Sequence, residues 1–162
     1  IFVAIFLGYS IGSAPIVSYH YGARNSEELK NLLTKSLKMI GVWSVALFAL
    51  AQLIASPLAR IFVGYDPNLF DLTRHGFRIF CLAFLVNGFN IYGSSFFTAL
   101  NNGLLSAVIS FLRTLVFQIA SVLLLPMIFG IDGIWGAVFV AEILTLCVTI
   151  ICLAKKQKVY HY

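Results

Sequence analysis

The stretch that decides the fold is IDGIWGAVFVAEILTLCVTIICLA, residues 131–154. Within it only Asp132, near its start, and Glu142 carry a charge. A helix needs about 20 mainly apolar residues to cross a hydrocarbon core about 30 Å thick, so this stretch is long enough to span a membrane. Four similar stretches precede it, at residues 1–21, 39–63, 77–100 and 104–129. The sequence therefore predicts an all-α integral membrane protein with five transmembrane helices.

The composition excludes a water-soluble protein. Hydrophobic residues make up 60% of the 162 residues, charged residues make up 10%, and the net charge is +5. Too few polar groups remain to cover a water-facing surface. The basic residues lie at the ends of the spans, where they suit lipid headgroups, so we expect contact with membrane lipids and none with nucleic acid.

The basic residues also predict how the chain crosses the membrane. They gather in residues 22–38, between the first two spans, and in residues 155–162, after the fifth span. The positive-inside rule places the first segment in the cytoplasm as an interfacial connection and the second as a cytoplasmic tail, with Ile1 at the outer face. Asn25 and Glu28 have capping-box spacing, which predicts a short interfacial helix that runs into the second span.

Four polar residues lie deep within the predicted spans: Asn87, Asn90, Arg113 and Glu142. At a rise of about 1.5 Å per residue, each lies about 15–20 Å from its entry side, near the bilayer midplane. A charge at that depth costs at least about 2.5–3.5 kcal/mol, so such groups pair, face the bundle interior or line a water-filled cavity.

Two interpretations of this polar level stay open. In the structural one, Arg113 and Glu142 form a buried pair that fixes the register of the fourth and fifth spans, and the asparagines bridge helices. In the functional one, Glu142 exchanges a proton or a cation, and Asn87 and Asn90 line a passage. The sequence alone favours neither strongly.

Prolines predict bends in the spans. Pro15 and Pro57 lie inside the first and second spans, and Pro126 lies toward the outer end of the fourth. Each removes a helix hydrogen bond and can kink its helix, as is common where transporters gate, although a fixed kink that improves packing is the alternative.

No motif of enzyme chemistry accompanies these spans. The sequence has no phosphate-binding glycine loop and no nucleophile elbow, and its histidines are too dispersed for a metal site. We therefore expect no enzyme activity, no metal and no cofactor. The expected activity is movement of a compound across the membrane.

Several motifs resemble one transporter family. The run GSAPIVSYHYGARN, residues 12–25, resembles the end of the second helix in each half of multidrug and toxic compound extrusion (MATE) transporters. The resemblance continues in order over the rest of the chain, through Phe89-Asn90, Phe96-Phe97, ISFLR at 109–113, Leu125-Pro126, FGIDGIW at 129–135, Ala141-Glu142 and Leu144-Thr145.

This resemblance implies a particular architecture and activity. Residues 1–162 would form a partial C-terminal lobe of the MATE/MOP-type bundle, helices eight to twelve of twelve, which is a six-helix lobe without its first helix. The activity would be cation-coupled antiport by alternating access in the inner or plasma membrane. Sodium ions or protons would enter as cationic or amphipathic drugs leave. The fragment would be inactive without the missing N-terminal lobe.

The resemblance also bears on single residues and on alternatives. Asn87 best matches an acidic residue with which some relatives bind a cation, and an amide cannot titrate. Glu142 matches a common position of the family. A lipid-linked precursor flippase of related architecture and a non-transporting membrane assembly protein remain the alternative functions.

Overall fold

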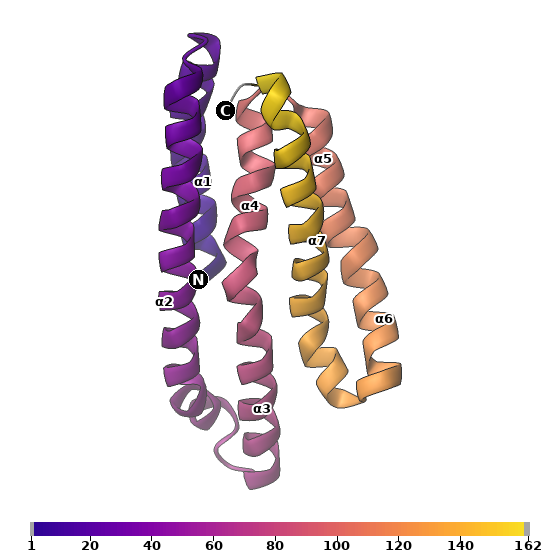
Figure 1. Ribbon diagram of the computed structural model, residues 1–162. Helices are drawn as coiled ribbons and strands as arrows, with labels where there is room; N and C mark the ends of the chain where they lie inside the picture. Colours follow the sequence, from indigo (N-terminus) through magenta and orange to yellow (C-terminus); the bar gives the residue numbers. More distant parts are fainter. Residues whose placement is uncertain (1, 161–162) are drawn as a thin grey trace.

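Five long helical rods run side by side in the structure, a computed structural model that describes residues 2–160 apart from the side chain of Lys158 (Figure 1). By length and composition all five can cross a membrane: Phe2–Gly22, Ser26–Val63, Pro67–Ala99, Gly103–Phe129 and Ile131–Gln157. The predicted fold class is confirmed. Ile1, which we expected at the outer face, and the end of the predicted tail, His161 and Tyr162, lie outside the described residues.

The first two helices form an antiparallel pair, α1 (Phe2–Gly22) and α2 (Ser26–Val63). Asn25 caps α2, because its side-chain Oδ1 accepts a hydrogen bond from the Glu28 backbone N–H at 3.2 Å. Residues 26–38 are helical, as the capping pattern predicts, and they continue into the second span without a break. Pro15 and Pro57 lie inside these helices and end neither of them.

The third span begins earlier than residue 77, where the apolar pattern places it. Helix α3 (Pro67–Phe80) starts after Asp66, whose carboxylate accepts hydrogen bonds from the backbone N–H groups of Asn68 and Leu69. A 3-10 turn, η1 (Cys81–Ala83), joins α3 to α4 (Phe84–Ala99). Residues 67–76 escape the hydropathy pattern because α3 is amphipathic and carries Asp71, Arg74 and His75.

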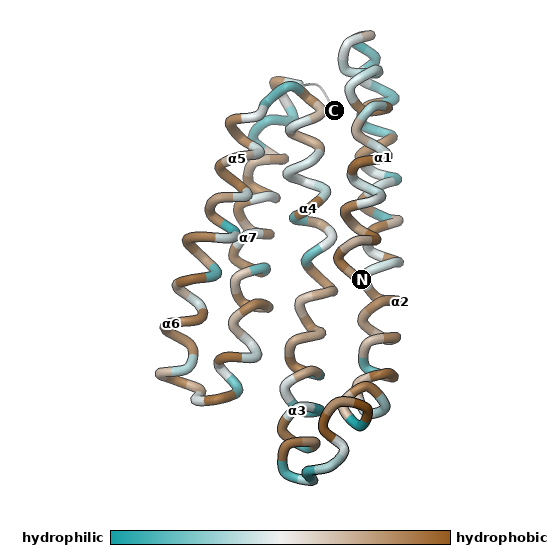
Figure 2. The backbone as a smooth tube through the Cα atoms, turned by 180° about the vertical axis from the view of Figure 1, so that it is seen from behind, coloured by the Kyte–Doolittle hydropathy of each residue, from teal (hydrophilic) through white to brown (hydrophobic). Residues whose placement is uncertain are grey.

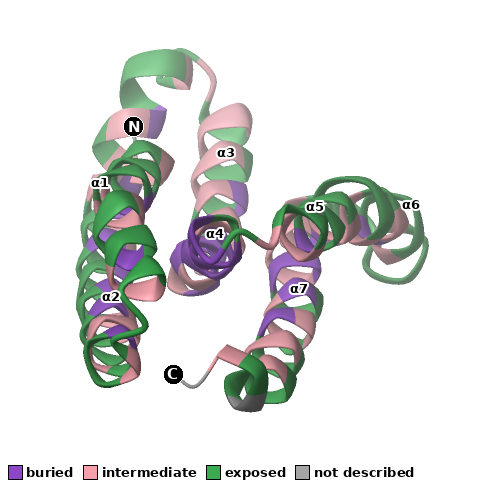
Figure 3. Cartoon of the chain, turned by 90° about the horizontal axis from the view of Figure 1, so that it is seen from above, coloured by how far each residue is buried: buried purple, intermediate pink, exposed green. Residues whose placement is uncertain are grey.

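Helix α4 is the centre of the molecule. It lies between the α1–α2 pair on one side and α5 and α7 on the other, and most of its residues are buried (Figure 3). Gly93 lets α7 approach closely, because a Cβ at this position would overlap Thr149 Cγ2. The central position of α4 means that its polar residues can reach several neighbouring helices.

The fourth span is interrupted near its middle. Helices α5 (Gly103–Phe111) and α6 (Gln118–Phe129) are joined by a π-helical segment, η2 (Leu112–Phe117), which contains Arg113. Such π-helical turns are rare and often lie at functional sites. Pro126 lies inside α6, near its end, and the following turn uses Gly130 at a φ of 58°, which favours glycine.

The last helix, α7 (Ile131–Tyr160), continues through residues 155–160 of the predicted tail. Its end lies with the α1–α2 and α4–α5 turns at one end of the bundle, whereas the α2–α3 and α6–α7 turns lie at the other (Figure 1). Hydrophilic residues gather toward these two ends and apolar residues cover most of the length between them (Figure 2). This is the distribution that a bilayer requires.

Candidate functional site

The four deep polar residues meet in one hydrogen-bonded group, which we call the midplane cluster: Asn87, Asn90, Arg113 and Glu142. The Arg113 guanidinium donates from Nη2 and Nε to Glu142 Oε1 at 2.6 and 2.9 Å. Arg113 Nη2 also donates to Asn87 Oδ1 at 3.1 Å. Asn90 Nδ2 donates to Glu142 Oε2 at 2.7 Å and to the Glu142 backbone oxygen at 2.8 Å.

Three elements build this cluster. Helix α4 presents Asn87 and Asn90 on one face, because residues three apart lie one above the other on a helix. Helix α7 supplies Glu142, and it also supplies Thr149, whose hydroxyl donates to Asn90 Oδ1 at 3.2 Å. Segment η2 supplies Arg113. The cluster therefore joins α4, α7 and the fourth span at one level.

Burial makes these hydrogen bonds obligatory. The Glu142 side chain is 4% exposed, and Asn90 is fully buried. Both Glu142 carboxylate oxygens have a partner, and the opposite charges of Glu142 and Arg113 compensate each other. The two oxygens accept three hydrogen bonds in all, so most of the acceptor capacity of Glu142 is used within the cluster.

The structure thus brings Asn87, Asn90, Arg113 and Glu142 together and forms the buried pair of the structural interpretation. Coupling by Glu142 and a passage along the two asparagines stay predictions, because a static pair does not reveal exchange. The other two gating candidates lie outside the cluster, Pro15 in α1 and Pro126 in α6, and their gating role also stays a prediction.

A groove of about 300 Å³ runs beside the cluster, between α1 and the α4–α5 hairpin. Arg113 lies on it with a side chain that is 24% exposed. The remaining lining residues are Leu7, Ser10, Ile11, Ile91, Ser94, Ser95, Thr98 and Ser110. These hydroxyl groups do not stand out in the sequence, because isolated serines are common in membrane helices. The available signal was the four-residue spacing of Ser94 and Thr98, repeated after a tight turn in Ser106 and Ser110.

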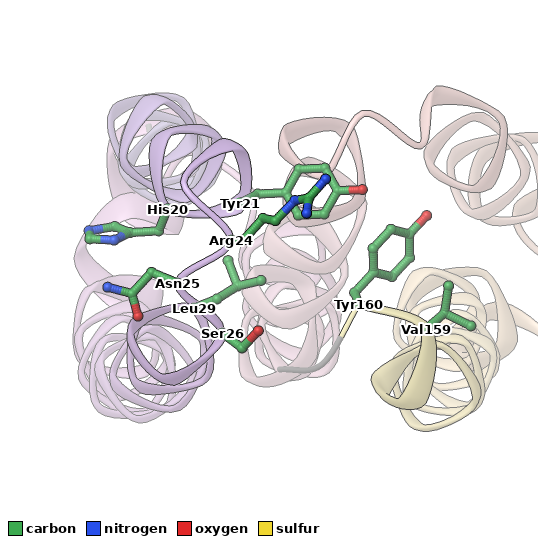
Figure 4. A pocket seen from close by; sticks show the side chains of 8 residues that line it. All are labelled: His20, Tyr21, Arg24, Asn25, Ser26, Leu29, Val159 and Tyr160. Carbon is green, nitrogen blue, oxygen red and sulfur yellow. The ribbon is translucent and has the colours of Figure 1, made fainter.

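A second cavity, of about 230 Å³, lies at the end of the bundle that holds the α1–α2 turn (Figure 4). Tyr21 of α1 and Tyr160 of α7 face each other there with ring centroids 5.7 Å apart, and Arg24 lies beside them. Tyrosine and arginine are typical of the level of lipid headgroups. Among residues 2–160, no three His, Cys, Asp or Glu side chains are grouped so that they could hold a metal ion.

A family model described as MatE matches residues 1–124. An inward-facing structure of a multidrug resistance MATE family transporter of the MOP superfamily is 18% identical, with a TM-score of 0.90 over 99% of this chain and 37% of that one. An outward-facing structure of such a transporter is 19% identical, with a TM-score of 0.88 over 96% of this chain and 35% of that one.

The Vibrio cholerae MATE transporter VcmN in its bent form is 16% identical, with a TM-score of 0.88 over 98% of this chain and 36% of that one. At these identities the likeness concerns the fold. The chain spans little more than a third of the length of the solved transporters that it matches. No curated protein matches it in sequence.

Proposed function

Because the chain belongs to the MATE family, a family of membrane transporters and not of enzymes, we propose that it is most of one lobe of a secondary active multidrug exporter. The whole transporter would expel cationic or amphipathic compounds in exchange for sodium ions or protons. The observation that carries this proposal is the midplane cluster, because charged groups at membrane depth are expensive and typically serve transport.

We assign the chain to the C-terminal lobe, helices eight to twelve, which needs the N-terminal lobe for activity. The support is the basic segment that follows the apolar part of α7 and the position of that segment at the same end as the basic residues 22–38. The positive-inside rule supports a cytoplasmic position for both. The proposed export of drugs from the cell would require an inner or plasma membrane.

Alternating access requires parts that keep their shape while they move. The five-helix arrangement resembles both an inward-facing and an outward-facing transporter, with TM-scores of 0.90 and 0.88. This supports movement of the five helices as one body. The midplane cluster would hold that body together, since it ties α4 and α7 to η2.

The decisive experiment reconstitutes the full-length protein in proteoliposomes and imposes a sodium or a proton gradient. We expect ethidium efflux driven by one of the two gradients. If neither gradient drives efflux of ethidium or of other cationic and zwitterionic compounds, the proposed function is wrong.

The variant Glu142→Gln tests whether Glu142 couples the ion. A coupling role predicts that efflux loses its dependence on the gradient while the yield of folded protein is unchanged. A loss of folded protein alone would assign Glu142 to structure. Asn87 and Asn90 would then be bridging residues and would not line a passage.

Neither alternative function is favoured by a specific observation. A flippase for a polyanionic lipid-linked precursor needs several cations in the lobe interior, and within the described spans Arg113 at mid-depth is already compensated by Glu142. A non-transporting assembly protein would keep its polar groups away from water. The part of Arg113 that lies open to the groove supports the transporter instead.

A further inference from the structure

The groove between α1 and the α4–α5 hairpin carries hydrogen-bond donors and a positive charge. We propose that it binds the anionic end of an amphipathic compound, that is, a carboxylate group. This inference rests on the proposed function, because it names the part of a transported compound that this lobe receives.

Four hydroxyl groups form a connected set across the α4–α5 hairpin, which we call the hydroxyl cluster: Ser94, Thr98, Ser106 and Ser110. Ser94 Oγ lies 2.8 Å from Ser106 Oγ and 2.9 Å from Ser110 Oγ. Thr98 Oγ1 donates to Ser106 Oγ at 2.7 Å. Three of the four side chains line the groove, and Thr98 and Ser110 are exposed.

The hydroxyl cluster can leave one hydroxyl group free to donate a hydrogen bond to a ligand. Each hydroxyl donates one hydrogen bond, and three contacts join the four groups; the hydroxyls of Ser94 and Thr98 also lie within reach of the backbone oxygens of Ser106 and Ser94. If the donation runs from Thr98 through Ser106 and Ser94, it ends on Ser110, whose own hydroxyl proton is then free. Ser110 and Arg113 both line the groove.

Arg113 offers the strongest donor of the groove. Its Nε and Nη2 atoms serve Glu142 and Asn87, whereas Nη1 makes no hydrogen bond to the described residues. A guanidinium N–H binds an anionic oxygen roughly twice as strongly as a neutral donor does. On the α1 side, Ser10 lines the groove, and its buried hydroxyl has no partner in the described part of the chain.

The same arrangement disfavours a cationic group in this groove. No carboxylate is among the residues that line it, and both oxygens of the nearby Glu142 are bound by Arg113 and Asn90. An ammonium group would therefore meet neutral hydroxyl oxygens and the Nη1 donor of Arg113, with no anionic oxygen to bind it. Electrostatics thus selects the acceptor end of a zwitterionic compound and leaves its cationic end for another part of the transporter.

The remaining walls of the groove suit the apolar part of an amphipathic compound. Leu7 and Ile11 of α1 and Ile91 of α4 line the groove together with the hydroxyl groups. In Figure 3, α1 and α5 lie on opposite sides of α4, and α4 contributes four of the lining residues. A volume of about 300 Å³ is at the lower end of the range for small-molecule sites.

The test uses the full-length protein and three probes. Norfloxacin carries a carboxylate and an amine, its decarboxylated analogue keeps the amine, and ethidium is a cation without a carboxylate. The variant Ser94→Ala/Ser110→Ala removes two groove hydroxyls, and Ser13→Ala is the matched control, because the Ser13 hydroxyl donates to the Ser10 backbone oxygen and does not line the groove. Binding is measured by calorimetry in nanodiscs.

We expect the double variant to bind norfloxacin about tenfold more weakly and the other two probes as the wild type does. Arg113→Lys keeps a positive charge beside Glu142 but lacks the second arm of the guanidinium, so it should show the same selective loss. Ser13→Ala should bind all three probes like the wild type. Thermal unfolding of each variant reports whether the protein is folded.

Three results would overturn the inference alone. An equal loss of all three probes, or a lowered melting temperature without a change in probe preference, would mean that the hydroxyl groups serve helix packing, for instance against another helix of the transporter. If the wild type binds ethidium and fails to bind norfloxacin, the inference also fails while the proposed function stands. If the wild type neither binds nor transports any probe, both fail.

Discussion

Arg113 and Glu142 compensate each other at a depth where either charge alone would be costly. Their hydrogen bonds also use Asn87 and Asn90, so that four polar side chains are partners within one cluster. Such pairs add little net stability, because the desolvation of two charges offsets their attraction. Their contribution is to fix the geometry, because these hydrogen bonds form together only in one register of α4, η2 and α7.

Removing one charge should therefore cost more than removing both. We expect Arg113→Met and Glu142→Met each to lower the free energy of unfolding by about 3–5 kcal/mol, because each leaves one buried charge unpaired. The double variant should recover most of this loss. Thermal unfolding of the full-length protein in detergent measures all three. If the double variant loses the sum of the two single losses, the pair is not the unit that we describe.

The two asparagines should differ in their contribution to stability. Asn90 is fully buried and takes part in three hydrogen bonds, whereas Asn87 takes part in one, from Arg113. Asn90→Leu should therefore lower the free energy of unfolding by about 1–3 kcal/mol more than Asn87→Leu. The same unfolding assay compares them. Equal losses would contradict the role of Asn90 as the link between α4 and α7.

At the scale of elements, the hydropathy of the sequence predicted the features that depend on composition alone. The five spans and the common depth of Asn87, Asn90, Arg113 and Glu142 follow from run length and from the rise of a helix. The start of α3 at Pro67 did not follow, because its first ten residues are amphipathic. Neither did η2 or the hydroxyl cluster, because a π-helical turn has no clear composition and the pairing of Ser94 with Ser106 depends on how α4 and α5 pack.

The contact between α4 and α7 depends on Gly93. We expect Gly93→Ala to destabilise the protein by about 1–3 kcal/mol, because the added Cβ would overlap Thr149 Cγ2. Thr149→Ser removes that methyl group and keeps the hydroxyl that binds Asn90, so Gly93→Ala/Thr149→Ser should regain part of the stability. Melting temperatures report both.

Gly12→Ala is the matched control for Gly93→Ala, because nothing lies within 4 Å of a Cβ at Gly12. We expect this variant to melt close to the wild type. Failure of Thr149→Ser to rescue Gly93→Ala would show that the strain lies elsewhere than at the α4–α7 contact.

At the scale of the whole molecule, the arrangement of turns divides the protein into two ends. One end holds the α1–α2 turn, the α4–α5 turn and the end of α7, and the other holds the α2–α3 and α6–α7 turns (Figure 1). Both basic segments lie at the first end. The proposed orientation, with that end in the cytoplasm, therefore makes one prediction for each end of the bundle.

Single cysteines can test this orientation in cells. Glu27 marks the α1–α2 turn, and Tyr65, which is 81% exposed, marks the α2–α3 turn. In full-length protein whose native cysteines, Cys81, Cys147 and Cys152 among them, are replaced by serine, a membrane-impermeant maleimide should label Tyr65→Cys in intact cells. It should label Glu27→Cys only after permeabilisation, because the basic residues hold that end inside. The reverse labelling pattern would mean that the lobe has the opposite orientation in the membrane. The basic segment after α7 would then not lie in the cytoplasm.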